Sequence, residues 1–467
     1  MSSGGFLSGE TKGLKAGGLN SGTDSLHESA SKIAGICLKG EFNSERVGND
    51  REDGLEVGER CSERVGLGAL LEAARMETGT GMTKASVGTA LPQRLISLDV
   101  LRGITIAFMI MVNNNGGPGS WGFMNHAQWN GLTPTDLVFP TFVFVVGASI
   151  VFAFDSRLKR GETRVKLAWH TVKRAGILFL LGIVVNSFPF FELAHMRFYG
   201  VLQRIAVCYL VVGLFYLWDG RVWTKVVALV LALVGYWVLL RWVPVPGAGM
   251  PGRDIPFMDQ SQNLVSWLDR LLLKGHLYLP WTTHDVRDPE GLLSDLPAIG
   301  TALIGLLTGL WLRGKAAVKD KAMGLAAAAV GCLSCGYLWS VWFPLNKNLW
   351  TSSYVLVAAG WSLTLLTVVF WTAEVEGRRK AYWPWLVFGS NAIVAYMISE
   401  LLASTLDTVA IAVSPQQHES LSTFLFAHNF TLIPDPGWAA FAYSVTYTAV
   451  CFIPVWVLYR KKIFVKV

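Results

Sequence analysis

The chain has 467 residues, of which 52% are hydrophobic and 16% are charged. With a mean hydropathy of +0.41, this composition is far from that of a soluble globular protein. The apolar residues form long blocks, which indicates a polytopic membrane protein. The net charge of +7 comes from Lys and Arg in short clusters between these blocks. Such clusters are typical of topology signals and argue against a nucleic-acid surface.

The first 90 residues differ from the rest of the chain. They are rich in Gly, Ser, Glu and Arg and contain no sustained apolar block, which predicts a disordered extension. The alternative is a wrongly assigned translation start, because Met76 and Met82 both lie close to the first apolar segment. Residues 91–467 are expected to form one transmembrane domain.

Ten apolar segments have about the 20 residues needed to cross the hydrocarbon core of a bilayer. They are 95–114, 135–154, 168–187, 200–218, 222–243, 295–312, 322–343, 351–373, 384–404 and 438–459. This pattern predicts an all-α fold, a transmembrane bundle of about ten helices. Residues 418–433 are partly apolar and are interpreted as a short interfacial or re-entrant piece.

The charges of the connections predict the topology of the bundle. Basic clusters occupy alternate connections, at 155–167, 219–225, 313–321 and 378–380, and the C-terminal tail. The short connections between them carry only Arg197 and Lys347 as basic residues. By the positive-inside rule, both termini are expected in the cytoplasm. The loops 115–133, 244–294 and 405–437 then face the opposite side.

His126, in the loop 115–133, is the strongest candidate for chemistry. Asn113, Asn130 and Asp136 gather at the same end of the first helical hairpin, where such side chains can orient an imidazole or bind a substrate. A histidine there can act as a general base toward an amine or hydroxyl, or as a nucleophile that carries an acyl group. The alternative is an ordinary surface histidine.

Basic residues near the opposite end of the bundle are candidates for binding an anionic ligand. Arg102 lies three residues after Asp99, which predicts either a structural ion pair or a cavity that holds an anion. Together with Arg102, Lys173 and Arg174 can form a basic mouth for phosphates, or they can extend to the lipid headgroups. Arg204 either lines the same cavity from its far side or satisfies polar groups within the bundle.

The loop 244–294 supplies Asp288 and Glu290, which are candidates for binding a cationic substrate or are simply solvated. The sequence has no Walker loop, no HExxH and no GxSxG motif. ATP-driven transport and common soluble hydrolase designs therefore lose support. We expect no metal.

Five motifs, taken in order along the chain, resemble the heparan-alpha-glucosaminide N-acetyltransferase family, including its shorter bacterial members. They are RLISLDVLRGI, HAQWNGLTPTDLVFPTFVFVVG, GVLQRIAV, DPEGLLSDLPAI and FGSNAIVAY. The similarity extends over residues 93–462. The resemblance implies a membrane-embedded acetyltransferase that takes acetyl-CoA from the cytoplasm and acetylates an amino sugar on the opposite side.

The resemblance also implies roles for particular residues. The family's active-site histidine, in HA-x-WNG, maps to His126, and the asparagine of its VN motif maps to Asn113. Here three asparagines stand in a row and the spacing to His126 is longer than in the animal enzyme, so Asn114 and Asn115 are alternatives. The basic residues Arg102, Lys173, Arg174 and Arg204 are then expected to bind the phosphates of acetyl-CoA.

The expected partners are an amino-sugar or glycan acceptor and the lipid bilayer, with a homodimer left open. We expect a multi-pass protein of the bacterial inner membrane, because the sequence contains no organelle-targeting segment and is short for the animal family. One alternative is a secondary transporter or flippase of a sugar or glycan, since ten helices and intramembrane charges suit a carrier. Another is an O-acyltransferase that acts on an envelope polysaccharide.

Overall fold

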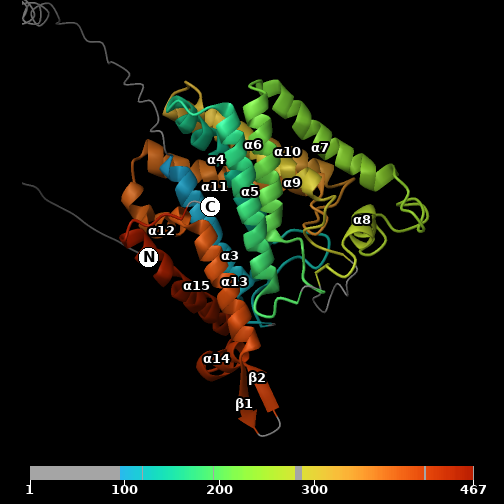
Figure 1. Cartoon of the computed structure of the whole chain (residues 1–467), viewed down its shortest axis with the longest axis vertical. Helices are drawn as coiled ribbons and strands as arrows, with labels where there is room; N and C mark the ends of the chain where they lie inside the picture. Colours follow the sequence, from blue (N-terminus) through green and yellow to red (C-terminus); the bar gives the residue numbers. More distant parts are fainter. Residues whose placement is uncertain (1–94, 118, 193, 279–286, 415–416, 466–467) are drawn as a thin grey trace, which may run out of the picture. The chain divides into compact units, whose positions relative to one another are not determined.

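A computed structural model describes residues 95–117, 119–192, 194–278, 287–414 and 417–465. The expectation for residues 1–90 lies outside the described residues. Helices make up most of the described chain (Figure 1). The long helices are α3 (Ile96–Asn113), α4 (Val138–Lys159), α5 (Arg164–Ser187), α6 (Val201–Trp218), α7 (Val222–Trp242), α9 (Asp295–Arg313), α10 (Val318–Trp339), α11 (Ser352–Phe370), α13 (Ala392–Thr408) and α15 (Pro436–Arg460).

Shorter elements connect or extend these helices. The short helices are η1 (Gly122–Met124), η2 (Pro134–Leu137), α8 (Leu264–Leu272), η3 (Trp371–Val375), η4 (Arg379–Tyr382), α12 (Trp383–Ser390) and α14 (Leu421–Asn429). The strands β1 (Ala410–Ser414) and β2 (Gln417–Ser420) form one antiparallel hairpin. The end of β2 and the whole of α14 lie in the segment 418–433, for which the sequence predicts an interfacial or re-entrant piece. With nine residues, α14 is too short to span a bilayer.

The expected fold class is confirmed. In the described part of the chain, nine helices are long and apolar enough to cross a membrane, and a bent pair of helices adds a tenth span. The bent pair was predicted as one helix over 384–404. Instead, the chain turns by 66° between Arg379–Ser390 and Ala392–Thr408. Asn391 lies at the break and bonds the C-terminal tail through the Ile463 carbonyl and the Val465 N–H.

Small residues let two helix pairs approach closely. A Cβ added to Gly305 of α9 would lie 2.0 Å from the Phe144 carbonyl oxygen of α4, and one added to Gly389 of α12 would lie 2.0 Å from the Asp99 carbonyl oxygen of α3. Only glycine permits such backbone contacts, which are common between membrane helices. Helix α4 therefore packs closely on α9, and α12 packs closely on the N-terminal half of α3.

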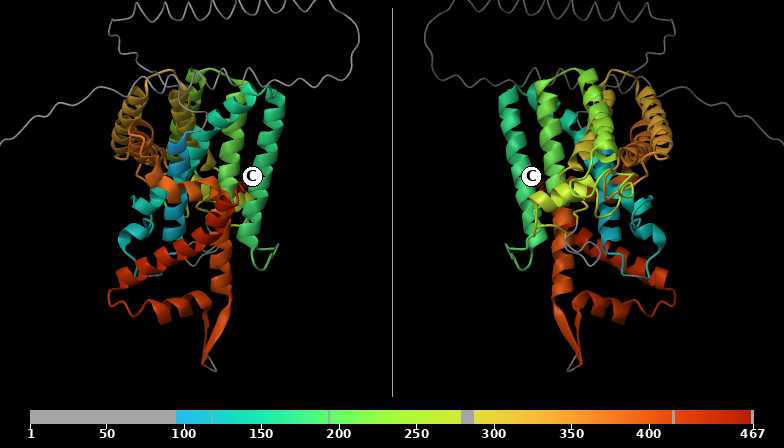
Figure 2. Two further views of the ribbon diagram at one scale, coloured as in Figure 1. Left: turned by 90° about the vertical axis from the view of Figure 1, so that its left-hand side faces the viewer. Right: turned by 90° about the vertical axis from the view of Figure 1, so that its right-hand side faces the viewer.

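The helices alternate in direction, so their connections gather at two ends of the bundle (Figure 2). The loop between α3 and α4, with His126, lies at one end, together with the connections α5–α6, α7–α9 and α10–α11. The basic connections α4–α5, α6–α7 and α9–α10 lie at the other end. The candidate site and the basic clusters are thus separated by the length of the helices.

Candidate active site

The loop between α3 and α4 is built around Asp136. Its Oδ2 accepts hydrogen bonds from the backbone N–H and the hydroxyl of Thr133, both at 3.0 Å, and from the N–H of Ala127 at 3.1 Å. Thr133 and Asp136 form a capping box at the start of η2. Because the carboxylate is completely buried and has three donors on one oxygen, it is held in a single position.

His126 binds the other oxygen of this carboxylate. Its Nδ1 lies 2.7 Å from Asp136 Oδ1. An ionised carboxylate only accepts hydrogen bonds, so Nδ1 carries the proton and Nε2 keeps a lone pair. The His126 side chain is 49% exposed, whereas that of Asp136 is 1% exposed. A buried carboxylate thus orients a half-exposed imidazole, an arrangement suited to a general base or a nucleophile.

Lys347 completes this group from the connection between α10 and α11. Its Nζ lies 3.1 Å from Nδ1 and 3.2 Å from Nε2 of His126, and 3.9 Å from Asp136 Oδ1. Burial lowers the pKa of Lys347 below its usual value, while the negative charges of Asp136 and Glu290 oppose this shift. The imidazole therefore lies between a buried anion and an amine of lowered basicity.

The backbone around Lys347 is fixed against the histidine loop. Asn346 is completely buried, and its amide nitrogen donates to Asn130 Oδ1 at 3.1 Å. The Asn346 side-chain oxygen accepts from the Leu349 N–H at 2.8 Å, and the Gly131 N–H donates to the Leu345 carbonyl at 2.9 Å. Asn130 thereby helps to hold Lys347 beside His126.

Asp288 and Glu290 form a buried ion cluster with Arg197. The Arg197 guanidinium donates from Nε to Asp288 Oδ2 at 2.8 Å, and its Nη2 binds both Asp288 and Glu290. Both residues are less than a tenth exposed. Burial raises the pKa of Glu290, but the positive charges of Arg197, Arg204 and Lys347 together hold it below its usual value. Within the described residues, the two predicted substrate-binding carboxylates are thus already engaged by an arginine.

Arg204 lies in the first turn of α6, at the His126 end, and is completely buried. It donates to Asp295 Oδ1 at 3.0 Å, to the Gly291 carbonyl at 3.2 Å and to the Ser294 hydroxyl. Its guanidinium also lies 4.8 Å from the ring centroid of Trp350. These contacts match the alternative in which Arg204 satisfies polar groups within the bundle.

The three asparagines at the end of α3 have different partners. Asn113 donates to Glu400 Oε1 of α13 at 3.2 Å. By contrast, Asn114 bonds the Ile110 carbonyl, and Asn115 bonds the Asn125 side chain at 2.8 Å. Asn114 and Asn115 thus shape the end of the helix and the loop, while Asn113 joins this loop to another helix.

The other predicted anion-binding residues lie apart from Arg204. Arg102 donates to Asp99 Oδ1 at 3.0 Å and to the Ser149 hydroxyl at 2.7 Å, so the ion pair expected for it is present. Lys173 and Arg174 lie on α5 and are exposed, and the Arg174 guanidinium lies over the Tyr209 ring. Among the described residues, no group of three or more His, Cys, Asp and Glu side chains could hold a metal ion. The absence of a metal remains a prediction.

Sequence reasoning did not assign roles to Lys347 and Glu400. Lys347 had a signal, since it is one of two basic residues in the short connections that the charge pattern assigns to the non-basic side. Glu400 also had one, as an acidic residue within an apolar segment, where an ionisable group needs a partner or a function. Their partners, His126 and Asn113, could be identified only from the folded chain.

The fold and the apolar helices define the chain as a polytopic membrane protein. Residues 94–247 match the family described as heparan-alpha-glucosaminide N-acetyltransferase, catalytic. The chain is 30% identical over 426 residues to heparan-alpha-glucosaminide N-acetyltransferase of Homo sapiens, covering 81% of the chain and 61% of the relative. It is 28% identical over 425 residues to the protein of that name in Mus musculus, covering 80% and 60%.

The chain is therefore related to the heparan-alpha-glucosaminide N-acetyltransferases, and the family resemblance of its motifs is confirmed. The chain spans about three fifths of the length of these relatives. The matched segment 94–247 contains the loop with His126 and Asp136.

Proposed function

We propose that the chain is a membrane-embedded acetyltransferase. It moves an acetyl group from acetyl-CoA, bound from the cytoplasm, to the amino group of a glucosamine-type sugar on the opposite face. The observation that carries this proposal is the imidazole of His126, which is oriented by the buried Asp136 and lies beside Lys347. The names of the two relatives supply the reaction type and the sugar class.

The chemistry requires a base, because an amine attacks a thioester only in its unprotonated form. Nε2 of His126 takes a proton from the acceptor nitrogen as this nitrogen bonds to the acetyl carbon. The tetrahedral intermediate then collapses, the carbon–sulfur bond breaks, and the imidazolium returns the proton to the CoA sulfur. The products are the N-acetyl sugar and free CoA. Lys347 stabilises the negative charge that develops on the carbonyl oxygen.

A second route uses the same residues with a covalent intermediate. Nε2 attacks the thioester, the carbon–sulfur bond breaks, and CoA leaves as a thiolate. The sugar amine then displaces the imidazole from the acetyl carbon, and the proton that the amine loses neutralises the thiolate through the solvent. Asp136 stabilises the positive charge of the imidazole ring on either route. The two routes differ in whether CoA is released before the acceptor binds. Rapid-quench trapping of acetylated protein in the absence of acceptor distinguishes them.

The proposed orientation follows the charge of the connections. The end of the bundle that carries the basic clusters faces the cytoplasm with both termini, and His126 faces the opposite side. Arg102, Lys173 and Arg174 are proposed to attract the phosphates of acetyl-CoA at or near the cytoplasmic end. Arg204 is assigned a structural role instead. The proposed location is the bacterial inner membrane, and the proposed assembly is either a monomer or a homodimer.

The acceptor is proposed to bind beside the histidine loop. Asn113 is the asparagine assigned to the site, because its side chain reaches across to Glu400 and not only to its own loop. Asn130 is proposed to contribute by holding the loop of Lys347. Asp288 and Glu290 are proposed to influence acceptor binding indirectly, because both bind and position Arg197.

The test is transfer of radiolabelled acetyl from acetyl-CoA to glucosamine-terminated acceptors by the purified full chain in detergent. His126→Ala is expected to abolish labelling and to lower the melting temperature only slightly, because the imidazole is half exposed and Asp136 keeps its other hydrogen bonds. His428→Ala serves as a control, since His428 is an exposed histidine on α14. Wild-type turnover in His126→Ala would show that the assignment of the base is wrong.

The break at Asn391 favours one alternative, a carrier for a sugar or glycan. Discontinuous helices often mark the substrate sites of secondary transporters. A carrier would exchange a labelled amino sugar across vesicles in the absence of acetyl-CoA, whereas the acetyltransferase would not. The O-acyltransferase alternative would transfer the label to hydroxyl groups of a polysaccharide. The labelled product would then be an ester, which alkali hydrolyses.

A further inference from the structure

A second polar region lies at the end of the bundle opposite His126. A cavity of about 200 Å³ opens between the ends of α4, α5, α6, α7 and α9. Three cations line it, Arg164, Lys225 and Arg313, against one carboxylate, that of Asp155. The cavity therefore has an excess of positive charge.

The contacts of these cations leave them able to bind a further anion. Arg164 donates from Nη1 to the Leu217 carbonyl at 3.0 Å, and a guanidinium has five N–H donors. The Lys225 ammonium has three donors, and within the described chain it donates to the Asp219 carbonyl. Arg313 is already paired, through Nη1, with Asp155 at 2.8 Å and with the Tyr216 hydroxyl at 2.9 Å.

Lys225 gives the strongest indication that an anion binds in this cavity. Its side chain is 1% exposed. A buried charge is costly unless hydrogen bonds and an opposite charge compensate for it. The Asp219 carbonyl oxygen, the charge of the partly exposed Asp219 carboxylate and the face of the Phe215 ring, with its centroid 4.8 Å from Nζ, supply only part of that compensation. An anion in the adjacent cavity would supply the rest.

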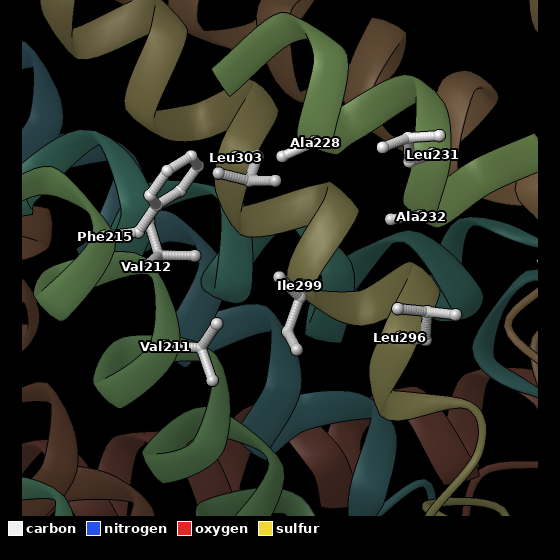
Figure 3. A pocket seen from close by; sticks show the side chains of 9 residues that line it. All are labelled: Val211, Val212, Phe215, Ala228, Leu231, Ala232, Leu296, Ile299 and Leu303. Carbon is white, nitrogen blue, oxygen red and sulfur yellow. The ribbon is translucent and has the colours of Figure 1, made fainter. Parts of the chain in front are cut away.

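An apolar cavity of about 350 Å³ lies between the same helices α6, α7 and α9 (Figure 3). All of its lining residues are apolar, among them Val212, Ala228, Ile299 and Leu303. Phe215 joins the two regions, because it lines the apolar cavity while its ring packs under Lys225 of the basic one. The basic cavity therefore adjoins the apolar one, and the two together are called the amphipathic site, with charge at the end of the bundle and hydrocarbon toward its middle.

We infer that this site binds an anionic phospholipid, with its phosphate among Arg164, Lys225 and Arg313 and an acyl chain along α6, α7 and α9. The position suits a lipid, because a headgroup lies at the end of a transmembrane helix and its chains lie along the helix. A CoA molecule fits less well, because the amide groups of its pantetheine arm would be buried without hydrogen-bond partners in a cavity lined only by apolar side chains. The inference does not depend on the proposed acetyltransferase activity.

The test measures thermal unfolding of the delipidated full chain in detergent micelles. Addition of dioleoyl phosphatidylglycerol is expected to raise Tm by about 2–4 °C in a concentration-dependent manner, because a ligand that binds only the folded state stabilises it. Dioleoyl phosphatidylcholine, inorganic phosphate and CoA are each expected to produce a smaller shift. An equal shift with phosphate or CoA alone, or no shift with phosphatidylglycerol, would overturn the inference.

Two variants locate the effect. Arg164→Gln removes a cation from the basic cavity, and Lys166→Gln removes an exposed cation outside the cavity on the same helix. Ala228→Phe fills the apolar cavity, and Val226→Phe adds the same ring at an exposed position that does not line it. The rise in Tm on addition of phosphatidylglycerol should be lost in Arg164→Gln and Ala228→Phe. It should be retained in the controls, Lys166→Gln and Val226→Phe. A full response in both test variants would show that the lipid binds elsewhere.

Discussion

The Nζ of Lys347 lies within 3.2 Å of both ring nitrogens of His126, although 221 residues separate the two in sequence. An amine between the two nitrogens is not aligned with one lone pair, so it leaves Nε2 available to a substrate. Its charge lies beside Nε2, where it can attract a negative charge that develops on a bound substrate. Lys347 can therefore serve as the electrostatic partner of the base.

The fall in rate on the alkaline side of the pH–rate profile should reflect the loss of the Lys347 charge. Burial lowers the pKa of Lys347 below 10.5, and Arg204 adds to the shift, while Asp136 and Glu290 oppose it. The positive charge is present below the lowered pKa and is lost as pH rises through it. We expect kcat/KM to fall at a pH below that of an ordinary lysine. Lys347→Arg should remove this fall, because a guanidinium stays charged.

The neutral variant Lys347→Met should lose about 10²–10³-fold in kcat below the lowered pKa of Lys347, as expected when a charged donor to an oxyanion is removed, and the difference from wild type should shrink above it. Lys315→Met is the control, since Lys315 is exposed in the connection between α9 and α10 at the other end of the bundle. If Lys347→Met keeps the alkaline fall, another group titrates there and Lys347 has only a structural role.

Asp136→Asn should impair both catalysis and folding. An amide has one acceptor oxygen, whereas Asp136 accepts from His126 through one oxygen and from Ala127 and Thr133 through the other. The imidazole loses the partner that fixes its tautomer, and we expect a fall in kcat of about 10²–10⁴-fold. The unpaired buried donors should cost about 1–3 kcal/mol, seen as a lower Tm.

The stability effect of Asp136→Asn can be separated from its catalytic effect. His126→Asn removes the base and leaves the capping box of Asp136 intact, so it should lose activity at nearly wild-type Tm. Asp136→Asn should lose both. Wild-type kcat per folded molecule of Asp136→Asn would contradict the orienting role of the carboxylate.

The sequence predicted the bundle and the position of His126 because both depend on local signals. Apolar segments of spanning length and the charge of adjacent connections need no tertiary contacts to be recognised. His126 and Asp136 lie ten residues apart in one loop, so their proximity could be expected. The bend at Asn391 could not, since it coincides with bonds from Asn391 to a tail more than 70 residues away.

Two basic residues that depart from the charge pattern were the clearest indication in the sequence of a buried ion pair. Arg197 and Lys347 are the basic residues of the short connections on the side opposite the basic clusters. Both lie against buried carboxylates, Arg197 with Asp288 and Glu290, and Lys347 with Asp136. A cation that departs from the topology rule is thus explained by a specific partner, which hydropathy alone cannot identify.

Arg197→Met should strongly destabilise the chain. It would leave Asp288 and Glu290 as two buried carboxylates without their cation, and breaking a buried ion pair in this way costs about 3–5 kcal/mol. The measurement is Tm in detergent, with Arg253→Met as the control, because Arg253 is an exposed arginine paired with its neighbour Asp254. Adding Asp288→Asn and Glu290→Gln to Arg197→Met should recover part of the loss. No recovery would mean that the packing of Arg197, and not its charge, matters.

Asp269, on α8, should make the stability fall as pH rises toward neutrality. Its Oδ1 accepts from the Leu292 N–H at 3.0 Å, and its buried Oδ2 has no hydrogen-bond partner among the described residues. Burial raises the pKa of Asp269 to about 7 from 3.8. Between these two values the folded chain holds a proton that the unfolded chain has released, so stability is lost across that window and stays low above it.

Asp269→Asn removes this titration. The difference between the Tm of the variant and the Tm of wild type should therefore be more favourable to the variant at pH 8 than at pH 5. Asp259→Asn is the matched control with the opposite sign, because N–H donors from Ser261 and Gln262 lower the pKa of Asp259 despite partial burial. Its carboxylate stabilises the fold above the usual aspartate pKa, so Asp259→Asn should lower Tm at pH 8 and have less effect in acid. If Asp269→Asn changes Tm equally at both pH values, Asp269 is ionised throughout and its buried oxygen has a partner in solution.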